Sequence, residues 1–248
     1  MATANAARPP PPEAATEANF ERFEWGAIAA ELDRYGCAVI GPLLDRATCQ
    51  ALAGLYRDEA HFRSRIVMAR HGFGRGEYQY FANPLPPTIA GLRTGLYPPL
   101  AAIANRWVDA LGTGARFPDR HEAFLARCHR AGQNRPTPLL LEYQAGDYNC
   151  LHQDVYGEHV FPLQVAVLLS EPGVDFSGGE FVLTEQRPRL QSRAEVVPLK
   201  QGEGVIFPVR ERPVQGTRGV YRVNMRHGVS RLRSGRRHTL GVIFHDAV

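Results

Sequence analysis

The stretch Tyr143-Gln-Ala-Gly-Asp-Tyr-Asn-Cys-Leu-His-Gln-Asp154 carries the pattern on which the interpretation of this chain depends. Residues two apart in a strand point to the same face, so His152 and Asp154 can both reach one metal ion. With a second imidazole from elsewhere in the chain, these side chains would form a two-histidine, one-carboxylate set, which leaves other positions of a non-haem Fe(II) open. By the same alternation, we expect Cys150 to line the same cavity.

The composition is that of a globular protein. The 248 residues are 44% hydrophobic and 22% charged, and this length suits one well-buried domain. No apolar run approaches the roughly 20 residues that span a bilayer, and the first residues lack the apolar segment of a secretory signal. We therefore expect no membrane partner and a cytoplasmic location. The four cysteines contain no C-x-x-C pair, so we expect no disulfide framework.

Two regions of different composition follow one another along the chain. Residues 1–18 are rich in proline and alanine, and we expect them to be a disordered lead-in to a single domain over residues 19–248. The part up to about residue 137 is helical in composition. Expected helices are Trp25–Arg34, a helix capped by Asp45 that runs through Thr48 to about Tyr56, and about Pro98 to Leu111.

From residue 138 onward, short β-branched and aromatic runs recur between glycine and proline turns. Strands of this length and spacing are typical of a sandwich or barrel. The predicted fold is mostly β, with a double-stranded β-helix (jelly-roll) core over residues 138–248 and supporting helices from the N-terminal part. The predicted strands are Pro138–Gln144, Phe161–Ser170, Glu180–Glu185, Glu195–Leu199, Gly204–Val209, Tyr221–Ser230 and Thr239–Phe244.

Further motifs surround His152-Gln-Asp154 in a definite order. Tyr143 begins the pattern Tyr-x-x-Gly-x(5)-His-x-Asp, and Gly178-Gly-Glu-Phe181, His227-Gly-Val-Ser230 and Arg237-His-Thr-Leu-Gly-Val-Ile-Phe244 follow it. In this order the motifs resemble the Fe(II)/2-oxoglutarate-dependent oxygenases, in their prolyl-4-hydroxylase-like branch. The resemblance covers roughly residues 138 to 246.

The resemblance implies a role for each of these residues. His152, Asp154 and His227 would bind the iron, while Arg237 would pair with the remote carboxylate of 2-oxoglutarate and Tyr143 would hydrogen-bond the same group. A guanidinium fork matches a carboxylate in a bidentate way that a lysine does not. Arg236 is the alternative anchor. The alternation of the last strand places Arg237, Thr239 and Gly241 on one face and Arg236 on the other.

The implied reaction consumes 2-oxoglutarate and O2. The cosubstrate would be decarboxylated to succinate and CO2, and a C–H bond of the substrate would be hydroxylated. The iron would carry this step, while the protein would supply orientation and a dry cavity.

The substrate is first suggested by the segment around Gly76-Glu-Tyr-Gln-Tyr80, which is similar to the lid of AlkB-type nucleic-acid dealkylases. Stacking of an extruded base needs aromatic rings, and phosphates need cations. The candidates are Arg70, Phe73, Arg75, Tyr78 and Tyr80, although an aromatic strand packed on the core would give the same pattern. The stretch from Arg187 to Arg237 contains 13 basic residues and only three acidic ones. This excess fits either a phosphate-contacting surface or arginines on solvated faces.

Other functions remain open at this point. The Gly-Gly-Glu motif and the spacing of His227 and Arg237 also fit a prolyl-4-hydroxylase-like enzyme that acts on a protein, a peptide or an amino acid. The dealkylase pattern Arg-x(5)-Arg, begun at Arg237, would need an arginine where this chain has Ile243. A non-catalytic jelly-roll binding module or a cupin-type metal enzyme fits less well, because the iron ligands, Arg237 and Tyr143 are all present. The basic balance favours alkylated nucleic acid. The oligomeric state is not indicated.

Overall fold

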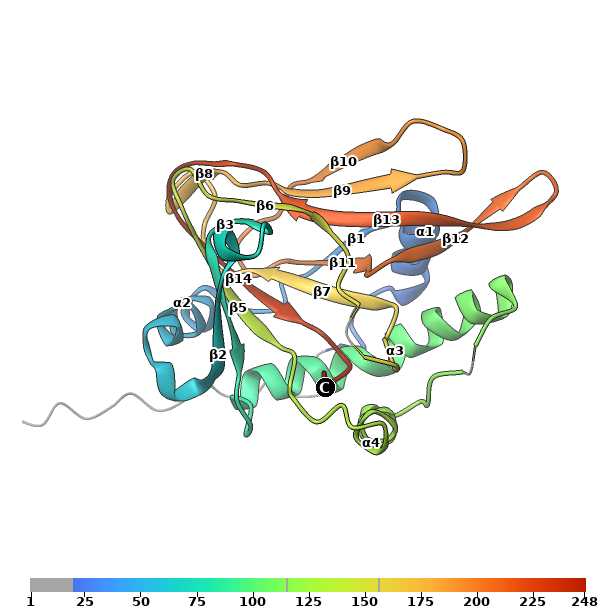
Figure 1. Ribbon diagram of the computed structural model, residues 1–248, viewed down its shortest axis with the longest axis horizontal. Helices are drawn as coiled ribbons and strands as arrows, with labels where there is room; N and C mark the ends of the chain where they lie inside the picture. Colours follow the sequence, from blue (N-terminus) through green and yellow to red (C-terminus); the bar gives the residue numbers. More distant parts are fainter. Residues whose placement is uncertain (1–19, 115, 156) are drawn as a thin grey trace, which may run out of the picture.

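The computed structural model describes residues 20–114, 116–155 and 157–248, so the expected lead-in over residues 1–18 lies outside the described residues. Two antiparallel sheets face each other, and helices lie against the larger one (Figure 1). This is the expected jelly-roll architecture. Within the described residues, no helix has both the length and the apolar character that crossing a membrane requires.

The larger sheet, called the major sheet below, includes strands from both halves of the chain. Its order is β1 (Ala38–Ile40), β11 (Gly204–Pro208), β7 (Leu163–Leu168), β14 (Leu232–Val242), β5 (Leu139–Gln144), β4 (Glu77–Phe81) and β2 (Phe62–Val67), with β8 (Phe176–Gly178) paired to β14. The part of the chain before residue 138 therefore supplies strands as well as helices.

The smaller sheet, called the minor sheet, faces it. Its order is β10 (Arg193–Val197), β9 (Phe181–Gln186), β13 (Gly219–Val229), β6 (Tyr148–His152) and β3 (Gly74–Arg75), with β12 (Glu211–Gly216) paired to β13. The chain passes from the minor to the major sheet between β13 and β14, which are consecutive in sequence. All the predicted strands are present, although β14 begins at Leu232 rather than Thr239.

Side chains alternate between two cores. On β14, Leu240 and Val242 belong to a cluster that lies against the helices, whereas Arg237, Thr239 and Gly241 point into the space between the sheets. A strand buried on both faces can carry apolar residues toward one core and functional residues toward the other. The major sheet thus separates a helix-backed core from an inter-sheet space.

The helices partly follow the predictions. They are α1 (Trp25–Tyr35), α2 (Arg46–Gly54), α3 (Pro87–Leu111) and α4 (His121–Arg130), with 3₁₀ turns at Leu55–Arg57, Glu59–His61 and Met68–Arg70. Asp45 caps α2 as predicted, because its Oδ1 accepts a hydrogen bond from the Thr48 backbone N–H at 2.7 Å. Helix α4 was not predicted.

The predicted start of α3 at Pro98 is wrong. The prediction rested on the Ala-, Leu- and Ile-rich composition after Pro98, and proline is tolerated in the first turn of a helix. The helix instead runs from Pro87 through both prolines, because Ile89, Leu92 and Leu96 bury the same face that later residues of the helix bury. Packing against the major sheet outweighs the backbone hydrogen bonds that the prolines cannot make.

Candidate metal and cosubstrate site

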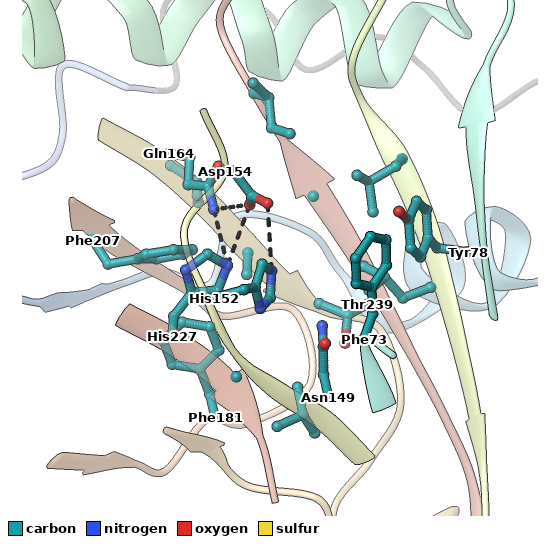
Figure 2. Close-up of a pocket in the computed structure, with 18 of the residues that line it drawn as sticks. Phe73, Tyr78, Asn149, His152, Asp154, Gln164, Phe181, Phe207, His227 and Thr239 are labelled. Carbon is teal, nitrogen blue, oxygen red and sulfur yellow. Dashed lines mark hydrogen bonds and ion pairs between the residues drawn. The ribbon is translucent and has the colours of Figure 1, made fainter. Parts of the chain in front are cut away.

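The three predicted metal ligands lie together between the sheets. His152 at the end of β6 is directly opposite His227 on β13, and Asp154 follows β6 by two residues. The Asp154 oxygens lie 3.4 Å from His152 Nε2 and 3.2 Å from His227 Nε2. One ligand atom from each residue falls within 4.8 Å of the others, so the three side chains could hold one metal ion. Figure 2 shows the three groups converging on one side of the cavity.

Burial, charges and hydrogen bonds shift the pKa values of the three candidate ligands in different directions. Burial opposes ionisation of Asp154, but the neighbouring His227 charge and hydrogen bonds from both imidazoles hold its pKa well below the usual value. Burial opposes the charged form of His227 and lowers its pKa, whereas at His152 burial is outweighed by the hydrogen bond and charge of Asp154, which raise the pKa. His152 Nδ1 lies 2.8 Å from the Cys150 carbonyl oxygen, which fixes Nδ1 as the donor and leaves Nε2 as the ligand atom. This donor set fits Fe(II).

A bulge in the minor sheet overturns the expectation for Cys150. His227 pairs with His152 and Val229 pairs with Asn149, so β6 carries one more residue than β13 in this interval. An extra residue reverses the alternation of the strand beyond it. Asn149 consequently lines the cavity, while Cys150 is exposed. All four cysteines are free, as expected.

Gln164 on β7 was missed by the sequence interpretation. Its Nε2 donates to Asp154 Oδ2 at 2.8 Å and lies 3.4 Å from His227 Nε2. It is buried with an exposure of 4%. The available signal was a single amide in an otherwise apolar strand, Leu163-Gln-Val-Ala-Val-Leu168. A buried polar side chain in such a strand must find a partner, and here the partner is the proposed iron ligand.

Arg237 is a buried cation with no acidic partner within 4.0 Å among the described residues, although the charge of Glu180 acts on it from further away. Its Nη1 donates to Thr239 Oγ1 at 2.5 Å, while Nε has no hydrogen-bond partner in that part of the chain. Burial lowers the pKa of Arg237 to about 10. Arg236, the alternative anchor, faces outward and lies 3.6 Å from Glu142. A buried guanidinium with spare donors is suited to an anionic ligand.

Tyr143 completes this end of the cavity. The Arg237 guanidinium lies 5.7 Å from the centre of its ring. Burial raises the pKa of Tyr143, and Asn149 lies near enough to lower it slightly, yet the hydroxyl has no hydrogen bond of good geometry in the described chain. A buried hydroxyl without a hydrogen bond and a buried guanidinium whose Nε has none in the described chain fit the carboxylate of 2-oxoglutarate.

One cavity of about 220 Å³ joins the metal-ligand cluster to Arg237 and Tyr143. Among the described residues, its titratable or charged lining consists of the three candidate ligands, Arg237 and the tyrosines, and most of the wall is apolar or aromatic. In Figure 2, Phe73 and Tyr78 lie across the cavity from the ligands. The other lining residues include Tyr80, Leu139, Leu141, Asn149, Gln153, Gln164, Phe181, Phe207, Thr239 and Ile243.

The predicted lid segment crosses from one sheet to the other beside this cavity. β3 pairs with β6 in the minor sheet, and β4 follows at once in the major sheet. Gly76 has φ 117°, and a Cβ there would lie 2.8 Å from the Tyr143 ring. A Cβ on Gly74 would lie 2.4 Å from the Tyr148 carbonyl oxygen. Both positions therefore require glycine.

The five residues predicted in the lid divide into two groups. Phe73, Tyr78 and Tyr80 line the cavity, and Phe73 is 46% exposed. Arg70 and Arg75 are exposed and lie outside the lining, with Arg75 Nε 3.8 Å from Asp147 Oδ1. The aromatic part of the segment thus faces the cavity, whereas its cations face solvent.

Comparisons with known proteins agree with this geometry. Residues 76–247 match a family described as "Oxygenase, catalysing oxidative methylation of damaged DNA". The uncharacterized proteins Rv2227 and MT2286, from two Mycobacterium tuberculosis strains, are each 52% identical over 167 residues, which is 67% of this chain and 72% of each relative.

Solved structures show the same fold. A Trichoplax adhaerens prolyl hydroxylase in complex with a hypoxia inducible factor peptide is 14% identical, with a TM-score of 0.54 over 92% of this chain and 91% of that one. A Burkholderia pseudomallei oxidoreductase of the 2OG-Fe(II) oxygenase family is 17% identical, with a TM-score of 0.50 over 89% and 90% of the two chains. The family match covers most of the chain, and the chain belongs to this oxygenase family.

Proposed function

We propose that His152, Asp154 and His227 bind Fe(II), that Arg237 and Tyr143 bind 2-oxoglutarate, and that the substrate is an alkylated nucleic acid. The observation that carries the proposal is the shared cavity. Three side chains that could hold a metal ion line one part of it, and a buried arginine with no carboxylate within 4.0 Å among the described residues lines another.

Several residues that line the cavity have separate tasks in this scheme. Arg237 neutralises the remote carboxylate of 2-oxoglutarate and Tyr143 donates a hydrogen bond to it. The Gln164 amide donates to Asp154 Oδ2 and so orients the carboxylate that would bind the metal. Phe181 and Phe207 pack beside the His227 ring, at centroid distances of 6.0 and 4.6 Å, and exclude water from that side. The bound iron supplies the oxidation of a substrate C–H with O2 and 2-oxoglutarate.

Nucleic acid is supported by the family description and by the walls of the cavity. Phe73, Tyr78 and Tyr80 offer ring faces on which a base can stack, and no acidic residue other than Asp154 lines the described cavity. For an N-methyl group, one oxygen atom of O2 enters the methyl C–H bond and the other enters succinate, with release of CO2. The hydroxymethyl group then leaves as formaldehyde, and the ring nitrogen regains a hydrogen.

The metal and cosubstrate assignments are tested without turnover. Fe(II) and 2-oxoglutarate added anaerobically should give a weak visible charge-transfer band in the wild-type protein and none in His152→Ala. The control is His159→Ala, because the imidazole of His159 lies outside the cavity lining. A band that persists in His152→Ala would overturn the metal assignment.

The substrate assignment needs a second experiment. Methylated single-stranded oligonucleotides, supplied with Fe(II), 2-oxoglutarate and air, should release formaldehyde and succinate in equal amounts. Production of succinate with peptides but with no oligonucleotide would replace nucleic acid by a protein substrate, while leaving the iron and 2-oxoglutarate sites intact.

A further inference from the structure

Arg63 occupies an irregular position in β2, next to the cavity. Phe62 pairs with Phe81 and Ser64 pairs with Tyr80, so Arg63 is an extra residue in β2, opposite no residue of β4. A bulge of this kind re-aims the side chain of the extra residue. The Arg63 guanidinium lies 4.5 Å from the centre of the Tyr80 ring, and Tyr80 lines the cavity.

Arg135 lies beside Arg63. Arg63 Nε donates to the carbonyl oxygen of Pro136, the next residue after Arg135, at 3.0 Å. The Arg135 backbone is held by two hydrogen bonds with Ala247, of 2.9 and 2.8 Å. Burial lowers the pKa of Arg63 and the charge of Arg135 also lowers it, whereas Tyr80 and the more distant Asp246 raise it. Arg63, with Arg135 near it, thus lies against Tyr80 of the cavity wall, and the two are called the rim arginines below.

Neither arginine has a carboxylate within 4.0 Å among the described residues, which distinguishes them from their neighbours. Arg65, two residues further along β2, is neutralised across the strand pair by Glu77 at 2.5 Å. Two like charges held close together, one of them partly buried, cost free energy unless an anion joins them. The irregular strand and the unneutralised charges together indicate a binding site for an anion.

We propose that Arg63 and Arg135 bind a phosphate of the nucleic-acid backbone, next to the base that stacks against Tyr80. The inference rests on the proposed function and specifies how that substrate is held. Guanidinium groups match phosphate oxygens in a bidentate way, and this site adjoins the aromatic wall of the cavity. Arg63 is positioned by its stacking on Tyr80 and by Pro136, so its side chain is ordered before the phosphate arrives.

The arginine-rich stretch between Arg187 and Arg237 is a weaker candidate for this role. Glu185 lies within 4.0 Å of Arg187, Arg193 and Arg212, and part of that positive charge is therefore already neutralised. Arg226 of this stretch is exposed and alternates with His227, so it lies on the outer face of the minor sheet, away from the cavity.

The test compares Arg63→Gln and Arg135→Gln with Arg226→Gln, which removes the same charge from the outer face. Binding of a methylated single-stranded oligonucleotide is measured by fluorescence anisotropy over a range of salt concentrations. Each rim variant should weaken binding by about tenfold, and the slope of log K against log salt should fall by about 0.7 for each lost phosphate contact. Arg226→Gln should retain both the wild-type affinity and the wild-type slope.

Three results would overturn the site. Equal losses in all three variants would mean that only overall charge matters, and unchanged binding in both rim variants would mean that the phosphate lies elsewhere. Arg135→Gln keeps the test valid if loss of the Pro136 contact unfolds Arg63→Gln, because the Arg135 side chain is exposed. A wild-type protein that binds no oligonucleotide would overturn the proposed nucleic-acid substrate together with this site.

Discussion

Arg93 and Arg237 are both buried, with exposures of 3% and 2%, but they lie in opposite surroundings. Arg93 on α3 donates to the carbonyl oxygens of Ile243 and His245 and to Asp246 Oδ1, at 2.7, 3.0 and 2.7 Å. Arg237 in the inter-sheet cavity has one hydroxyl partner and no carboxylate within 4.0 Å among the described residues. A buried guanidinium is therefore fully paired by the protein in one region and only partly paired in the other.

The difference indicates which region serves stability and which serves binding. Around Arg93, the C-terminal segment is fastened to α3, and His129 adds a contact of 2.8 Å to Asp246. Around Arg237, Tyr143 and His227 also keep buried polar atoms without partners in the described chain. Buried polar groups normally find partners within the protein, so a cluster of exceptions marks a place where a ligand completes the site.

The largest expected effect is on stability, from Asp246→Ala. The substitution leaves the Arg93 charge buried without a counter-charge, which should reduce the free energy of unfolding by about 3–5 kcal/mol. Urea denaturation measures the loss. His129→Ala, which removes only a half-exposed partner of the same carboxylate, should cost much less. Similar losses from the two variants would contradict a dominant role for the Arg93 pair.

Arg237→Met should reduce ligand affinity rather than stability. It removes a buried charge that has no acidic partner, so the ligand-free protein should lose little stability or gain some. The affinity for 2-oxoglutarate should fall by about 100-fold, or near 2.7 kcal/mol. Calorimetric titration measures the affinity, and Arg236→Met is the matched control on the outer face. Unchanged 2-oxoglutarate affinity in Arg237→Met would identify another anchor.

A finer comparison is available between two buried glutamines. Gln164 and Gln79 are each 4% exposed and each donate a bond of 2.8 Å, to Asp154 and to the Tyr56 carbonyl oxygen respectively. Gln164→Met should weaken metal binding by roughly 10- to 100-fold, because the Asp154 carboxylate loses its orienting donor. Gln79→Met should lose stability but retain metal affinity. Anaerobic titration with Fe(II) or Co(II) distinguishes the two, and equal affinities would remove Gln164 from the site.

The smallest expected effect is on the pH dependence of the free energy of unfolding. Burial opposes ionisation of Asp246, but the Arg93 charge and hydrogen bonds from His129 and Arg93 lower its pKa below the ordinary 3.8. The folded state then binds fewer protons than the unfolded state, so this stabilisation is present above the unfolded pKa and is lost as pH falls through the folded value. Unfolding free energies of the wild type and Asp246→Asn should converge as the pH is lowered through this range. A constant difference would contradict the linkage.

Much of the candidate site could be predicted from local sequence patterns. The alternation of β14 correctly separated Arg237 from Arg236, and the short apolar runs predicted the jelly-roll strands. The start of α3 could not be predicted in the same way. Pro98 is a strong local signal, whereas the burial of Ile89 and Leu92 depends on the tertiary structure. The role of Gln164 could not be seen either, since its partner comes from another strand.

The sequence by itself determined the chemistry available to this protein: two histidines and an aspartate at ligand spacing, a tyrosine, and an arginine on the inward face of the last strand. The tertiary structure decided which residues join them. One extra residue in β6 turned Asn149 inward and Cys150 outward, and one in β2 directed Arg63 onto Tyr80. The physical reason is that alternation is a property of one strand, whereas a bulge depends on the pairing of two.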